Sequence, residues 1–138
     1  MYCLMLASVV SIGAPALKEN RKPAESPAGQ WSIVQVEFSG HQSIRKPDDF
    51  CSIAIDKDSI SLLVGGGKSS SERVAFFQGN EIDFYPGDLK RLRKGIWKLS
   101  GDDLLICEAG VGKARPTDFS SAKGSGNALW TLKRIKKD

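Results

Sequence analysis

Residues 95–108 read GIWKLSGDDLLICE, and this stretch decides the class of the fold. Two short apolar runs, 95–99 and 104–108, flank the sequence SGDD at 100–103. Gly and Asp between two apolar runs of strand length are typical of a β-hairpin. The segment therefore predicts two antiparallel strands joined by a tight turn.

The same pattern continues in both directions from this hairpin. Short runs rich in Val, Ile, Phe and Trp recur between Gly, Pro, Asp and Ser, and no window shows a sustained helical period. Eight strands joined mostly by short turns indicate an all-β fold, either an antiparallel up-and-down β-barrel or a β-sandwich. We expect the barrel, because closure removes exposed strand edges. The predicted strands are residues 31–38, 50–55, 59–64, 72–78, 81–85, 95–99, 104–108 and 128–135.

The first predicted strand breaks its alternation once. Val34, Val36 and Phe38 share one face by parity, whereas Trp31 and Ile33 share the other. Either a β-bulge shifts the register within this strand, or its first half is buried on both faces.

Composition narrows the functional classes. The chain has 138 residues, 26% of them charged and 41% hydrophobic, which fits one globular domain. A net charge of +4 argues against a dedicated nucleic-acid binder. The single histidine, His41, lies in a predicted polar loop and excludes any mechanism that needs a histidine pair.

The N-terminal residues have the pattern of an export signal. Residues 1–16 carry no charged side chain, and the apolar run 4–12 is too short to span a bilayer. Ala14-Pro15-Ala16 supplies the small residues that an export peptidase reads. We expect a signal peptide at 1–16, a polar linker at 17–28 and the barrel domain at 29–138. The protein would then be exported, to the periplasm or outside the cell, with no transmembrane span left after cleavage; a buried N-terminal element is the alternative.

Two cysteines remain beyond that segment, Cys51 and Cys107. An oxidising compartment permits one disulfide between them. Two buried free thiols are the other reading, since both residues lie in predicted strands.

Three motifs resemble binding sites only in part. Residues 65–69, GGGKS, lack the spacing and the following helix of a phosphate loop, so 65–71 are predicted to be a flexible loop. Asp56-Lys57-Asp58 lacks the Gly and the terminal Glu of a calcium loop. The basic run 90–94 either contacts an anionic partner or is a solvated loop and strand start. We therefore expect no metal and no cofactor.

No catalytic set can be assembled from the sequence. His41 has no identifiable Ser, Cys or Asp partner. Glu37 and Glu108 lie on predicted strands, but their spacing does not support a pair of working carboxylates. We therefore expect that the protein is not an enzyme.

Three tryptophans, Trp31, Trp97 and Trp130, lie on three different predicted strands. They are either core residues or part of the wall of a ligand cavity. Since the first and last strands of a closed barrel are neighbours, Arg134 is predicted to stack on Trp31, a cation–π contact worth about 1 kcal/mol.

Several motifs carry a resemblance to a known family. They occur in one fixed order: Gly29-x-Trp31, Ile82-Asp83-Phe84, Gly95-Ile96-Trp97-Lys98-Leu99, Gly101-Asp102-Asp103-Leu104-Leu105-Ile106-Cys107, Arg115-Pro116-Thr117-Asp118-Phe119-Ser120-Ser121, Gly124-Ser125-Gly126 and Leu132-Lys133-Arg134. With these motifs the chain resembles the planctomycete-type lipocalin-like domain family, a group of unknown function, over residues 29–134. Trp97 stands where that family has the Tyr of a Gly-Ile-Tyr motif.

The resemblance implies an often exported, lipocalin-like barrel, and it directs attention to Arg115, Pro116 and Phe119. Arg115-Pro116 favours an extended backbone before a turn, which Thr117 or Asp118 can cap. Phe119 can plug one end of the barrel. Because loops often carry binding and catalytic residues, this motif in a predicted loop also allows a role in function.

Two functions follow from a barrel of this size. One is a non-catalytic binding protein whose interior holds a small apolar or amphipathic molecule. The other is an interaction or inhibitor module with a filled barrel, whose loops contact another envelope protein. An apolar cavity of a few hundred cubic ångströms favours the first, and a packed interior with an exposed apolar patch favours the second.

Overall fold

The computed structural model describes residues 27–44, 51–65, 67–87 and 89–136. The predicted signal peptide at 1–16 and residues 17–26 of the predicted linker lie outside these ranges. Of the predicted strand 50–55, residue 50 also lies outside them.

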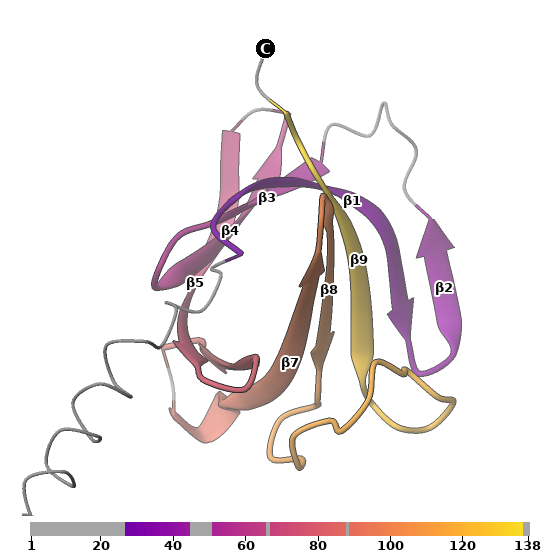
Figure 1. Ribbon diagram of the computed structural model, residues 1–138. Coiled ribbons are helices and arrows are strands. Elements are labelled where there is room, and N and C mark those ends of the chain that lie inside the picture. Colours follow the sequence, from indigo (N-terminus) through magenta and orange to yellow (C-terminus); the bar gives the residue numbers. More distant parts are fainter. Residues whose placement is uncertain (1–26, 45–50, 66, 88, 137–138) are drawn as a thin grey trace, which may run out of the picture.

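The described residues form antiparallel strands and one short 3₁₀ helix, Leu89–Arg91 (Figure 1). The strands are β1 (Gly29–Phe38), β2 (His41–Ile44), β3 (Cys51–Ile55), β4 (Ser59–Val64), β5 (Gly67–Phe77), β6 (Glu81–Tyr85), β7 (Arg93–Ser100), β8 (Asp103–Glu108) and β9 (Ala128–Arg134).

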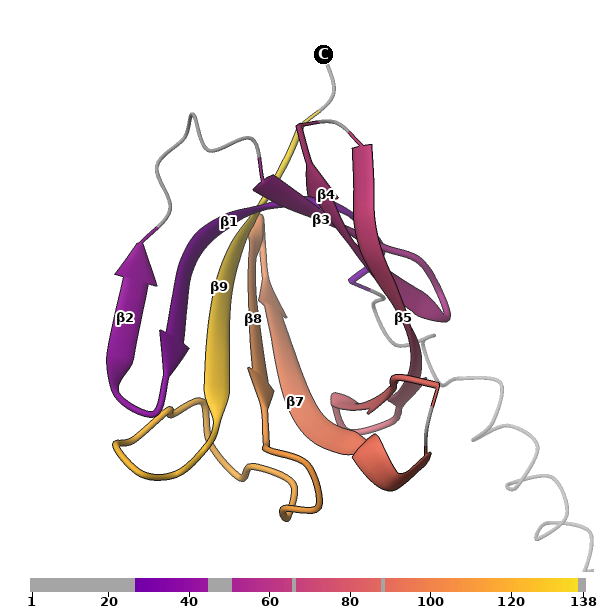
Figure 2. The ribbon, with the colours of Figure 1, turned by 180° about the vertical axis from the view of Figure 1, so that it is seen from behind.

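Eight of these strands close into a barrel. From β3 to β9 each strand pairs with the next, β1 pairs with β3, and the pairing of β9 with β1 completes the ring (Figures 1 and 2). The predicted up-and-down barrel is thereby confirmed. β2 stands outside the ring as the second arm of a hairpin with β1, and it pairs only with residues 35–38.

A bulge in β1 explains the broken alternation. The register with β9 shifts between Ile33 and Gln35, which leaves Val34 unpaired and 40% exposed. Trp31 and Ile33 before the bulge and Val36 after it all pack into the core. Of the two readings drawn from the sequence, the bulge is the correct one.

Alternation along the strands then turns apolar side chains into the barrel, where they are almost fully buried. The buried core consists of Trp31, Ile33, Ile53, Ile55, Val74, Ile82, Phe84, Trp97, Leu104, Ile106 and Leu132.

Trp31 anchors the end of the barrel where the chain enters β1. Its indole N–H donates to the Pro27 carbonyl at 2.8 Å, and both residues are fully buried. The guanidinium of Arg134 lies over the Trp31 ring at 4.3 Å, so the predicted cation–π contact is present. Arg134 also lies 3.8 Å from Asp102 and donates a 3.5 Å hydrogen bond to the Ala28 carbonyl.

Two segments predicted to be loops are strands. Residues 67–71 begin β5, because their backbone pairs with β4 and the Ser61 and Ser71 hydroxyls lie 3.1 Å apart. The flexible-loop prediction was wrong for 67–71, because it used the Gly and Ser content and ignored the partner strand. His41 begins β2, since Ser39 and Gly40 adopt positive φ values of 46° and 89° and fold the chain back as a hairpin.

Candidate functional site

A cavity of about 520 Å³ lies inside the barrel, within the size range of small-molecule sites. Residues from β3 to β9 contribute to its wall, together with Pro86 and Gly87 that follow β6. Its apolar lining consists of Ile53, Ile60, Leu62, Phe84, Ile106 and Trp130.

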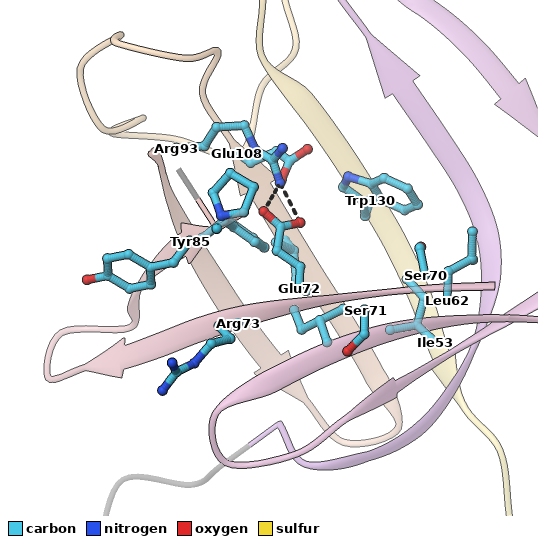
Figure 3. A pocket seen from close by; sticks show the side chains of 15 residues that line it. Ile53, Leu62, Ser70, Ser71, Glu72, Arg73, Tyr85, Arg93, Glu108 and Trp130 are labelled. Atoms are coloured by element: carbon cyan, nitrogen blue, oxygen red, sulfur yellow. Dashed lines mark hydrogen bonds and ion pairs between the residues drawn. The ribbon is translucent and has the colours of Figure 1, made fainter. Parts of the chain in front are cut away.

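Four charged residues line the cavity, and three of them gather as one cluster: Glu72 of β5, Arg93 of β7 and Glu108 of β8, whereas the Arg73 side chain is directed away from it (Figure 3). Strand pairing explains why charges lie inside. Arg93 is opposite the buried Phe84, and Glu108 is opposite Gly95, two residues after the buried Ile106. Alternation therefore turns these side chains inward.

Arg93 joins the two carboxylates unequally. Its Nη2 atom lies 2.8 Å from each carboxylate oxygen of Glu72 and 3.6 Å from the nearer oxygen of Glu108. Its guanidinium also lies 5.2 Å from the centre of the Phe84 ring, and its buried Nε has no hydrogen-bond partner within the described residues. Glu72 thus holds the guanidinium, and Glu108 has only a long contact with it.

The unequal sharing leaves Glu108 poorly compensated. Burial raises the pKa of this carboxyl above its ordinary value, Arg93 lowers it, the Glu72 charge raises it, and a hydrogen bond from Trp130 lowers it. Burial is the largest of these effects, so the pKa stays raised. Glu108 is therefore the group in the cavity most open to a new positive partner.

Arg115 lies outside the cavity and fastens the β8–β9 connection to the outer wall. It donates to the carbonyls of Ile82 at 3.1 Å and Gly95 at 2.8 Å. It also pairs with Asp83 at 2.7 Å and Glu81 at 3.0 Å. These four contacts to carbonyls and carboxylates of β6 and β7 use the forked geometry of the guanidinium, so Arg115 acts as a clasp that holds the connection to the barrel wall.

The other two motif residues lie with it on the outside. Pro116 is buried, whereas Phe119 is half-buried and belongs neither to the hydrophobic core nor to the cavity lining. That Phe119 plugs one end of the barrel therefore stays a prediction.

The three tryptophans divide between core and cavity. Trp31 and Trp97 are core residues, and Trp97 packs edge-on against Phe76 with ring centres 6.1 Å apart. Trp130 lines the cavity from β9. Trp31 and Trp97 are therefore core residues, as one interpretation of the sequence expected, and Trp130 is part of a cavity wall, as the other expected.

Cys51 and Cys107 are free thiols. Cys51 packs against the inner core, while Cys107 points to the outer face, where its thiol lies 3.5 Å from the Ser120 carbonyl. Side chains on opposite faces of the barrel wall cannot meet, so the disulfide reading is corrected to two free thiols. Burial also raises the pKa of the Cys107 thiol.

The sequence interpretation missed Glu72 and Arg93. Counting back by twos from Trp97 through Gly95 places Arg93 inside, but the basic run 90–94 was treated as one solvated unit. Lys90, Arg91 and Lys94 of that run are indeed exposed. Glu72 shares the parity of the inward Val74 and Phe76, so alternation along the predicted strand 72–78 could have placed it inside as well.

The remaining candidates lie away from the cavity. His41, Asp56 and Asp58 are exposed, and Glu37 is on the outward face of β1. Within the described ranges, no three His, Cys, Asp or Glu side chains gather as a metal site would require. No helix in that part of the chain is long and apolar enough to cross a membrane.

Comparisons of the chain with protein families, with curated proteins and with solved structures found no match. The class that fold and site define is therefore an eight-stranded antiparallel barrel with an internal, partly charged cavity. The lipocalin-like resemblance drawn from the motifs stays a prediction.

Proposed function

We propose that this protein is a non-catalytic binding barrel that takes one small amphipathic molecule into its interior cavity. The observation that carries the proposal is the cavity of about 520 Å³, which combines apolar walls with the charged cluster of Glu72, Arg93 and Glu108. The uncharged, apolar first sixteen residues support a place of action outside the cytoplasm.

The size of the cavity limits the ligand. A water molecule occupies about 30 Å³ in the liquid, so on this scale a cavity of about 520 Å³ holds roughly 17 non-hydrogen atoms. Burial of an alkyl chain against Ile53, Leu62 and Ile106 contributes about 0.8 kcal/mol per methylene group. About ten buried methylene groups would contribute roughly 8 kcal/mol, the free energy of micromolar binding before the cost of association is subtracted.

The cavity also bears on the alternative of an interaction module with a filled barrel. A filled barrel leaves no interior space, whereas here a cavity of about 520 Å³ remains beside the buried core. The binding proposal is therefore the one that the interior supports.

Adjacent residues of β4 provide the test. Leu62 lines the cavity, and Leu63 faces the opposite side of the strand. We expect the uncharged fluorescent probe N-phenyl-1-naphthylamine to bind the wild-type protein and the Leu63→Trp variant. Leu62→Trp fills the cavity, so it should lower the affinity for the probe by about tenfold or more.

Far-UV circular dichroism and the melting temperature check that both variants are folded. Equal probe binding by folded Leu62→Trp and Leu63→Trp, or no binding by the wild type, would refute the proposal. Native mass spectrometry of protein purified from its own host then identifies the resident molecule.

A further inference from the structure

The charged cluster in the cavity determines which polar head group a ligand can have. Glu72, Arg93 and Glu108 combine two carboxylates with one guanidinium, an excess of one negative charge when both acids are ionised. Barrel interiors with a free arginine attract anions, but this arginine is already held on both oxygens of Glu72 at 2.8 Å.

An anionic ligand would meet two penalties. It would compete for Arg93 with Glu72, whose two carboxylate oxygens already accept from Nη2 at 2.8 Å, and it would lie close to that like charge. It would also lie beside Glu108, whose like charge opposes it. Fatty acids and other carboxylates are therefore poor partners for this cavity.

A cationic head meets the opposite situation. Glu108 is 18% exposed at its side chain, has only a 3.6 Å contact with Arg93, and faces the cavity. An ammonium group there would gain a charge-assisted hydrogen bond and supply the missing positive charge. The Trp130 indole donates to the same carboxyl, so its apolar ring lies beside this end of the cavity.

We propose that the ligand of this barrel is an amphipathic amine, whose ammonium group binds the Glu108 carboxylate while its alkyl or aryl body lies against Ile53, Leu62 and Trp130. This inference rests on the proposed function and adds the sign of the ligand's charge. Glu108 is the residue that determines specificity, and Arg93 with Glu72 sets the local charge that favours a cation.

Proton linkage accompanies this binding. The charged groups that face Glu108 are Arg93 from β7 and Glu72 from β5, and the Trp130 indole of β9 donates to it. Figure 3 shows the side chains of Arg73 and Tyr85, which also line the cavity, directed away from this group. Because an ammonium favours the ionised carboxylate, amine affinity rises as pH increases through the raised pKa of Glu108.

Three ligands of equal chain length test the charge preference: decylamine, decan-1-ol and decanoate. Isothermal titration at neutral pH should rank the amine first, the alcohol second and the carboxylate last. Glu108→Gln keeps the shape and removes the charge, so it should lower the amine affinity by about tenfold and change the alcohol affinity much less.

Two further variants sharpen the result. Glu37→Gln makes the same charge change on the outer face of β1 and should alter none of the three affinities. The double variant Glu72→Gln with Glu108→Gln frees Arg93 and should reverse the preference toward decanoate. Amine titrations across a range of pH, each in two buffers of different ionisation enthalpy, should show proton release as the pH passes through the raised pKa of Glu108, and none in Glu108→Gln.

The outcomes separate the two proposals. If decanoate binds the wild type more tightly than decylamine, or if Glu108→Gln leaves the ratio of amine to alcohol affinity unchanged, the amine inference is wrong and the binding function stands. If none of the three ligands binds, both proposals fail.

Discussion

Replacing Arg134 by alanine tests whether the end of the barrel is held by the contact between first and last strands. The guanidinium contributes a cation–π contact at 4.3 Å to a fully buried Trp31. That contact is worth about 1 kcal/mol. The 3.5 Å hydrogen bond to Ala28 and the 3.8 Å, partly exposed pair with Asp102 add roughly 0.5 kcal/mol together.

We therefore expect Arg134→Ala to lower the free energy of unfolding by about 1.5 kcal/mol. For a domain of this size, that corresponds to a melting temperature lower by roughly 6 °C. Chemical denaturation and thermal scans followed by circular dichroism measure both quantities. The affinity for the naphthylamine probe should not change, because Arg134 does not line the cavity.

The neighbouring lysine provides the control. Lys133 is exposed on the outer face of β9, so Lys133→Ala should change stability by less than about 0.5 kcal/mol. Arg134→Lys keeps the charge but loses the planar stacking and should fall between the two. Equal stabilities of Arg134→Ala and Lys133→Ala would show that the Trp31 contact contributes nothing.

Three further predictions follow from the structure. Arg115→Ala should destabilise the protein by about 3 kcal/mol, because it leaves Asp83 buried without its cation. Hydrogen exchange should rise first within residues 109–127, and exchange there at the wild-type rate would contradict the role of Arg115 as a clasp. Since burial raises the pKa of Glu108, the folded state binds the proton more tightly than the unfolded chain, so stability should fall as pH rises from the ordinary glutamate pKa through the raised value; urea midpoints against pH should show this slope in the wild type and lose it in Glu108→Gln. Buried Cys107, with its raised thiol pKa, should react with iodoacetamide more slowly than half-buried Cys51, as peptide mass spectrometry can show; equal rates would contradict the burial of Cys107.

The sequence was sufficient for the barrel because its strands carry local signals. Residues 59–64 and 81–85 are predicted with the observed bounds, since Asp, Gly and Asn turns flank apolar runs on both sides. The first half of β5 and all of β2 carry polar residues, and only their backbone pairing with a neighbour makes them strands. That pairing is a non-local interaction, so the local composition predicted loops there.

From the sequence, the cavity was predicted only as one of two alternatives, an open interior or a filled barrel. Alternation could place Arg93 and Glu108 inside, but it could not show which inward residues touch. The meeting of Glu72 with Arg93 joins positions 21 residues apart and depends on the register of β5, β6 and β7. Likewise, the opposite orientation of Cys51 and Cys107 across the barrel wall follows from the register of their strands. It was not predicted from the residues next to them.

The bulge at Val34 has a consequence for insertions and deletions. Without this residue, Trp31, Ile33, Val36 and Phe38 would follow one uninterrupted two-residue phase, so removing it keeps every core side chain in phase. A chain shortened by one residue here should still close its barrel. The same deletion in a strand without a bulge would turn every inward side chain on one side of the deletion outward, and every outward one inward. Comparisons of related sequences should therefore allow a gap at this position. An ungapped alignment would match inward residues of one protein to outward residues of the other.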